Sequence, residues 1–160
     1  MIGRFIINFY ESLFHMEAPA PVTAEAALAC ANMGAEGEIA WVRTLSEEEQ
    51  AKYWDNVAAW EDPDRQGALL EEYNATFAAA DTDNDGRLNP AELRDMFNKD
   101  IANTKARGIP VQDMSAMTEE QFQGFYDAIN SMSEEPGITS AELMSWGWAM
   151  TKKMKELKQA

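Results

Sequence analysis

Residues 81–92, DTDNDGRLNPAE, form the stretch that most constrains what this chain can fold into. Asp81, Asp83 and Asp85 stand on alternate positions, and Gly86 follows where the backbone must bend sharply. In a loop that turns this tightly, alternate side chains point inward, so the three carboxylates converge. Carboxylate oxygens gathered in this way are the ligands of a hard divalent cation. This stretch, the acidic loop, therefore predicts a metal site.

The remaining positions of the acidic loop complete a set of oxygen ligands. We expect Arg87 to contribute only its backbone carbonyl, which makes a cationic side chain tolerable there. Asn89 can reach the metal directly or through a water, and Glu92 can close the shell with two oxygens. A shell of six to eight oxygens suits Ca²⁺ better than Mg²⁺. The predicted ligands are thus Asp81, Asp83, Asp85, Arg87, Asn89 and Glu92. The alternative is an acidic surface turn, because Asp, Asn and Gly are common turn residues.

The segments on either side of the acidic loop favour the metal site over a plain turn. Apolar residues recur at helical spacing before the loop and again after it; they are Leu69, Leu70, Tyr73 and Phe77, then Leu93, Met96, Phe97 and Ile101. Pro90 is compatible with the first turn of the second helix. With its helix–loop–helix pattern and its D-x-D-x-D-G-x5-E motif, the chain resembles the EF-hand calcium-binding family, the calmodulin-like superfamily.

Residues 131–142, SMSEEPGITSAE, are the predicted mate of the acidic loop, and we call them the partner loop. Ile138 and Glu142 stand at the positions that correspond to Leu88 and Glu92. EF-hand loops are usually paired through such apolar residues. The resemblance therefore implies that Leu88 faces Ile138 across a short backbone bridge.

The partner loop departs from the metal-binding pattern at several positions. Ser131 and Ser133 replace acids, and Glu135 is longer than aspartate. Pro136 stands where the turn glycine belongs, and Gly137 comes one residue late. Because affinity depends on the charge count and the loop geometry, we expect a degenerate loop that supports its neighbour without binding metal. The alternative is an irregular loop that still binds Ca²⁺ through carbonyls and water.

Residues 32–43, NMGAEGEIAWVR, match the same pattern more weakly. Gly37 and Ile39 match the glycine and apolar positions, but Arg43 replaces the closing glutamate and would repel a cation. The interpretation is a vestigial EF-hand around residues 22–45. An ordinary helix–glycine turn–helix is the alternative.

The expected fold class is all-α, with an EF-hand pair at 65–160 and additional N-terminal helices at 1–64. Capping boxes at Ser46 and Thr118 predict two helix starts. Other helices are expected at 23–31, at 66–80 and from Ala141 toward Lys158. Strand patterns of period two are nearly absent.

Residues 1–16 are predicted to form an apolar helix, with a stripe of Ile2, Phe5, Ile6, Phe9, Leu13 and Met16. We expect this helix to pack on the chain's own helices or on a partner subunit. A groove for a helix is suggested by the methionines after residue 90, which are Met96, Met114, Met117, Met132, Met144, Met150 and Met154. The alternatives are an anchor lying in a membrane surface for residues 1–16, and ordinary core packing for the methionines.

Composition excludes several classes of function. The chain of 160 residues carries 28 acidic and 13 basic side chains, a formal charge of −15, which disfavours nucleic acid and anionic membranes as partners. A single histidine and a single cysteine leave no recognisable catalytic pair, disulfide or zinc motif. We therefore expect neither an enzyme nor a small-molecule substrate, and a cytoplasmic location with a cytoskeletal association as an alternative.

Together these patterns predict a protein that binds one Ca²⁺ in the acidic loop. Its expected role is that of a sensor or adaptor that binds a protein partner, a target helix or an assembly subunit, when calcium is present. One alternative is a structural subunit of a larger assembly, for example a cytoskeletal one, in which Ca²⁺ stabilises the fold. A further alternative is a peripheral membrane adaptor anchored by residues 1–16.

Overall fold

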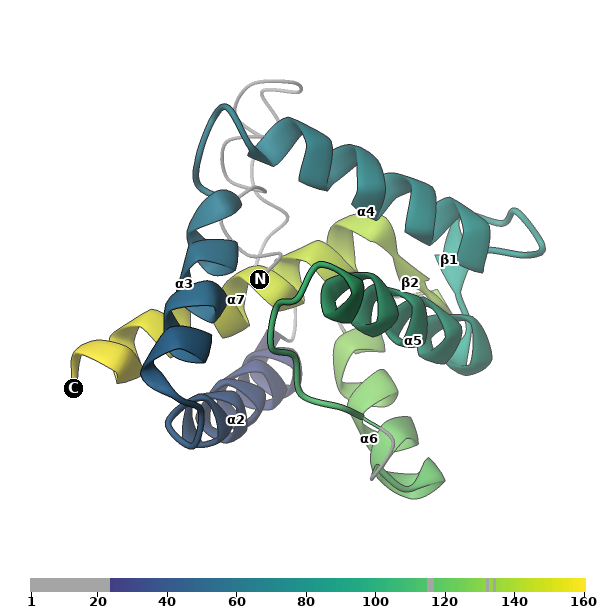
Figure 1. The fold of residues 1–160 in the computed structure, drawn as a ribbon. Coiled ribbons are helices and arrows are strands. Elements are labelled where there is room, and N and C mark those ends of the chain that lie inside the picture. The colour runs from purple at the N-terminus through teal and green to yellow at the C-terminus, as the bar shows by residue number, and fades with distance from the viewer. Residues whose placement is uncertain (1–23, 115–116, 132, 134) are drawn as a thin grey trace.

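The computed structural model describes residues 24–160 except 115–116, 132 and 134, so the predicted apolar helix 1–16 lies outside the described residues. The described chain is mostly helical, which confirms the all-α class. Figure 1 shows its elements in order, α2 (Ala24–Val42), α3 (Glu47–Ala59), α4 (Gln66–Ala80), β1 (Arg87–Leu88), α5 (Pro90–Ala106), α6 (Glu119–Asn130), β2 (Ile138–Thr139) and α7 (Ser140–Gln159). None of the described helices combines the length and apolarity needed to span a bilayer.

Four of the described helices begin with a reciprocal capping box. Ser46 and Thr118 cap α3 and α6, as predicted, each accepting from the backbone N–H three residues on. The same arrangement, with Asn89 for α5 and Thr139 for α7, starts the helix that follows each of the two loops. A cap satisfies N–H groups that have no partner within the helix. The caps at Asn89 and Thr139 therefore fix where α5 and α7 begin after the two loops.

The acidic loop and the partner loop lie side by side between two helix pairs (Figure 1). The acidic loop joins α4 to α5, and the partner loop joins α6 to α7. Strands β1 and β2 pair antiparallel, with Leu88 opposite Ile138 and Arg87 opposite Thr139. The predicted bridge between Leu88 and Ile138 is therefore confirmed.

The main core lies beneath these two loops. Side chains with no exposed surface come from both strands and from the helices around them, namely Leu88, Leu93, Ile129, Ile138 and Leu143. The Tyr126 hydroxyl donates to the Leu88 carbonyl at 2.8 Å and ties α6 to β1. Burying a large aliphatic side chain is worth about 1.5–3 kcal/mol, so the paired loops rest on a substantial apolar base.

A second core cluster joins the N-terminal helices to the end of α7. Ile39 and Val42 of α2 meet Tyr53 and Val57 of α3 around Met154. The first half of α7 contributes Leu143 and Met144 to the main core instead. This helix of 20 residues therefore belongs to both clusters and connects α2 and α3 to the main core.

The predicted vestigial EF-hand around residues 22–45 is wrong, and so is the alternative of a glycine turn. Residues 24–42 form one uninterrupted helix, so no loop exists at 32–43. An added methyl group at Gly34 would lie 3.6 Å from the Met150 sulfur, which shows how closely α2 packs on α7. Interior glycine costs about 1 kcal/mol in a helix, and this packing offsets that cost.

Candidate metal centre

The acidic loop brings its three aspartates together. One carboxylate oxygen from each of Asp81, Asp83 and Asp85 lies within 4.8 Å of the others. Asp81 is buried at the end of α4, whereas the other two are exposed. Convergence of these three side chains is what the alternate spacing predicted.

Backbone N–H groups of the loop hold the aspartates in place. The Gly86 N–H donates to Asp81 Oδ2 at 2.8 Å, and the Arg87 N–H donates to Asp85 Oδ1 at 2.8 Å. The Asp85 N–H is shared between Asp81 and Asp83, at 3.2 Å to one oxygen of each. Hydrogen bonds of this kind stabilise carboxylates in their charged form.

Two residues of the acidic loop adopt left-handed backbone conformations. Gly86 has φ +80° and Asn84 has φ +56°. Glycine adopts this region without steric cost and asparagine tolerates it better than most residues, so the sequence suits the bend at both positions. The predicted role of Gly86 as the turning residue agrees with this geometry.

The charges of the acidic loop are not balanced within it. The Asp85 N–H holds the pKa of the Asp83 carboxyl down, but desolvation and the nearby carboxyls of Asp81, Asp85 and Glu92 outweigh this bond and raise that pKa above its usual value. A carboxyl whose pKa is raised by neighbouring carboxyls gains stability in its charged form from a cation placed among them. The residues present therefore fit a hard divalent ion.

Glu92 closes the acidic loop from the start of α5. Its carboxylate is buried and accepts from the Thr82 N–H at 3.1 Å, the Thr82 hydroxyl at 2.8 Å and the Asn89 N–H at 3.0 Å. The Asn89 N–H is the largest of the influences that lower the Glu92 pKa, so the carboxyl stays ionised. Glu92 thus links the two ends of the loop and presents a charged group beside Asp81.

Asn89 also has a structural task. Its Oδ1 accepts from the Glu92 N–H at 2.9 Å and caps α5. The oxygen that the sequence assigned to the metal is therefore already engaged, although an amide oxygen has a second lone pair.

Arg87 extends out of its own loop. Nη1 donates to Ser133 Oγ and to the Gly137 carbonyl, both at 3.0 Å, and Nη2 lies 3.4 Å from a Glu135 carboxylate oxygen. The sequence suggested a role only for the backbone of Arg87, so this contact with the partner loop was missed. Alternation along a strand is the signal that could have found it, because the side chain next to inward-facing Leu88 must point the other way.

The partner loop is organised by a residue outside its predicted frame. Asn130 Oδ1 accepts from the Gly137 N–H at 3.0 Å, the bond that Asp81 makes with Gly86 in the acidic loop. A neutral amide thus stands where the acidic loop has a carboxylate. In the described part of the partner loop no cluster of acidic oxygens comparable to that of the acidic loop is found.

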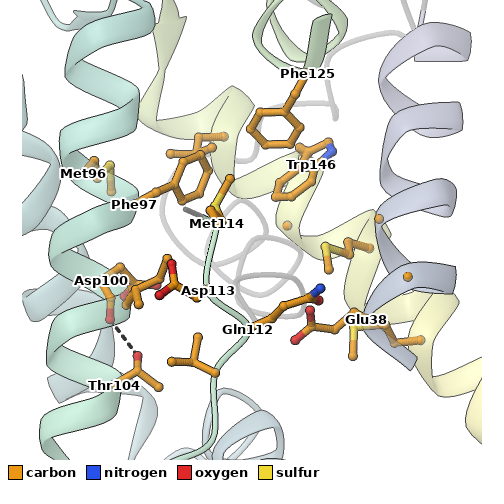
Figure 2. A pocket seen from close by; sticks show the side chains of 18 of the residues that line it. Glu38, Met96, Phe97, Asp100, Thr104, Gln112, Asp113, Met114, Phe125 and Trp146 are labelled. Carbon is orange, nitrogen blue, oxygen red and sulfur yellow. Dashed lines mark hydrogen bonds between the residues drawn. The ribbon is translucent and has the colours of Figure 1, made fainter. Parts of the chain in front are cut away.

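A cavity of about 600 Å³ lies between the helices, and α4 and α5, the two helices that the acidic loop joins, both contribute to its wall. Every described helix contributes to its wall, together with the connector between α5 and α6. Figure 2 shows Phe125 above Trp146 and Met114 reaching toward Phe97; the Phe125 and Trp146 rings meet edge to face at 5.0 Å. Six methionines line it, Met33, Met96, Met114, Met117, Met150 and Met154, five of which the sequence had assigned to a groove.

Acidic groups interrupt this apolar wall. Figure 2 shows Glu38 of α2 and Asp100 of α5 on opposite sides of the cavity, with Gln112 and Asp113 of the connector between them. Burial raises the pKa of both the Glu38 and the Asp100 carboxyls. The cavity is therefore apolar in its lining but favours a cationic group at this end.

The Glu38 carboxyl predicts a dependence of stability on pH. Glu38→Gln is expected to raise the free energy of unfolding at pH 7 by an amount on the order of 1 kcal/mol, because the amide avoids the cost of a buried charge. In the wild type the Tyr53 hydroxyl donates to Glu38 Oε1 at 2.9 Å, and the glutamine oxygen can still accept this bond. Because the folded-state pKa is raised, the wild type regains this stability as the pH falls through that pKa.

Urea unfolding of both proteins between pH 7 and pH 4 measures this effect. The gap between the two proteins should close as the pH falls. A Glu38→Gln protein less stable than the wild type at pH 7 would contradict the burial cost.

Comparison of the chain with protein-family models, curated proteins and solved structures finds no match.

Proposed function

We propose that this chain is an EF-hand calcium-binding protein with one competent loop, which couples Ca²⁺ binding to recognition of a helix from a protein partner. Asp81, Asp83, Asp85 and Glu92 would hold the ion with their carboxylates, and Arg87 and Asn89 would complete the shell with a carbonyl and an amide oxygen. The carrying observation is the convergence of three aspartate oxygens within 4.8 Å, in a loop paired with a second loop.

Coupling to a partner is supported by the two helices that the acidic loop joins. Leu69 and Tyr73 of α4 and Met96 and Phe97 of α5 line the cavity, and Tyr73 and Met96 also belong to the main core. A change in the angle between α4 and α5 would therefore change the width of the cavity. In EF-hand sensors, calcium changes this angle and exposes a methionine-rich groove.

The lining of the cavity favours an amphipathic helix that carries a basic residue. Methionine side chains are flexible and polarisable, so they adapt to different apolar surfaces. Glu38 and Asp100, whose burial disfavours their charge, would gain from a lysine or arginine brought by the partner. In this proposal the chain acts by binding a partner and not as an enzyme.

A model helix tests this function. A 16-residue peptide with a leucine face and a few lysines is expected to bind the full chain roughly 5- to 150-fold more tightly in Ca²⁺ than in chelator. Gly34→Leu should weaken that binding, because Gly34 lines the cavity and its new side chain would project among Trp146 and Met150. Fluorescence anisotropy of a labelled peptide, at physiological ionic strength, measures both effects.

The matched control is Gly124→Leu. Gly124 is also helical, has no neighbour within 4 Å of an added methyl group and does not line the cavity. It should leave peptide affinity unchanged. Equal affinity with and without Ca²⁺ would favour a structural role for the ion, and equal loss in both glycine variants would show that the peptide binds elsewhere.

A further inference from the structure

The guanidinium of Arg87 extends from the acidic loop into the partner loop. It reaches a hydroxyl, a backbone carbonyl and a carboxylate of that loop, on Ser133, Gly137 and Glu135 respectively. These are the oxygen types that an EF-hand loop uses for a metal ion. The Arg87 side chain is about three-quarters buried, whereas Glu135 is largely exposed, so the neutral acceptors define the geometry more than the ion pair does.

The partner loop is shaped to admit this side chain. A methyl group added at Gly137 would lie 2.7 Å from the Arg87 Cβ, and Gly137 has φ +103°, so glycine is required on both counts. Arg87 itself is fixed by the pairing of β1 with β2, opposite Thr139. The late glycine that seemed a defect in the metal-binding pattern is the residue that leaves room for the arginine.

Three further described groups in or next to the partner loop that could serve a metal make other contacts. The Ser131 hydroxyl donates to the Ala128 carbonyl at 2.6 Å. The Glu142 carboxylate accepts from the Thr139 N–H at 3.4 Å in the cap of α7. Asn130 supplies a neutral oxygen where the acidic loop has Asp81.

We propose that the Arg87 guanidinium is the permanent internal cation of the partner loop and takes the place that a metal ion has in the acidic loop. This cation is a side chain of the protein itself, so it is present whether or not calcium is bound. The partner loop is therefore held closed at every calcium concentration and takes up no metal. The inference deepens the proposed function by restricting the response to the acidic loop, but the role of Arg87 does not require that Ca²⁺ bind there.

Hydrogen exchange in chelator tests the proposal without calcium. In the wild-type full chain the amides of Gly137 and Ile138 should be protected, and Ca²⁺ should change their exchange little. Arg87→Met keeps the length of the side chain but removes its charge and donors, and should speed their exchange about tenfold, as expected for the loss of hydrogen bonds from a charged group. Arg87→Lys keeps the charge without the planar fork and should fall between the two.

Arg94→Met is the matched control, since Arg94 contacts Glu119 and the Phe122 ring away from the two loops. It should leave exchange in the partner loop unchanged. Unchanged exchange in Arg87→Met, or an effect equal to that of Arg94→Met, would overturn the proposal, and so would a wild-type partner loop that binds metal. Absence of Ca²⁺ binding to the acidic loop would instead contradict the proposed function and leave the exchange result standing.

Discussion

Replacing Glu92 by glutamine is expected to weaken calcium binding by about 10- to 100-fold. The change keeps the size of the side chain but removes the buried negative charge that lies beside Asp81 at the start of α5. Glutamine can still accept from Thr82 and Asn89, so the loop should keep its shape while losing an anionic ligand. Competition with a chromophoric chelator measures the affinity.

Glu142→Gln is the control for this substitution. Glu142 stands at the same position of the partner loop and likewise belongs to a capping box. Its replacement should change calcium affinity no more than a few-fold. Equal losses from the two variants would show that the effect arises from helix capping and not from metal coordination.

The second large effect is expected from Ile138→Ala. Ile138 has no exposed surface and faces Leu88 across the strand pair, so removing three of its carbon atoms should lower the free energy of unfolding by about 2–5 kcal/mol. It removes no metal ligand, yet calcium affinity should fall roughly fivefold or more because the acidic loop loses its support. Denaturant unfolding and the chelator assay measure the two quantities.

Ile109→Ala, in the half-buried connector beyond α5, controls for the loss of an isoleucine. A smaller loss of stability and an unchanged calcium affinity are expected. Normal calcium affinity in Ile138→Ala would show that the two loops, although paired, do not depend on each other for binding.

The parts of the fold that were predictable from sequence are those with local signals. Ser46 and Thr118 predict the starts of α3 and α6 because a capping box involves only the cap residue and the residue three positions later. The acidic loop is equally local, since alternate aspartates and a glycine determine its backbone whatever surrounds it. The bridge from Leu88 to Ile138 spans 50 residues, and it was predictable because the loops share a pattern.

The error at residues 32–43 has a different cause. Gly34 and Gly37 resemble turn residues, but α2 has no proline within these residues to end it, and it is stabilised by packing along α7. That packing involves residues more than a hundred positions away, which no local pattern contains. Tertiary contacts of this kind keep the chain helical despite the low helix propensity of glycine.

The contacts of the Arg87 side chain also could not be predicted from local sequence patterns. The motif assigns only a backbone role to that position, and the guanidinium finds its acceptors in the other loop. Asn130 was missed because counting back from Glu142 starts the partner loop one residue later. The cavity depends on the arrangement of all the described helices, so the sequence could indicate its methionines but not its shape.

Titration of the full-length chain with CaCl₂ by isothermal calorimetry tests the central claim most directly. We predict one equivalent of Ca²⁺ per chain, with a dissociation constant between about 10⁻⁷ and 10⁻⁵ M. A chain that shows no saturable binding would contradict the metal centre at Asp81–Glu92. Two equivalents of similar affinity would contradict the account of the partner loop as a loop whose cation is Arg87.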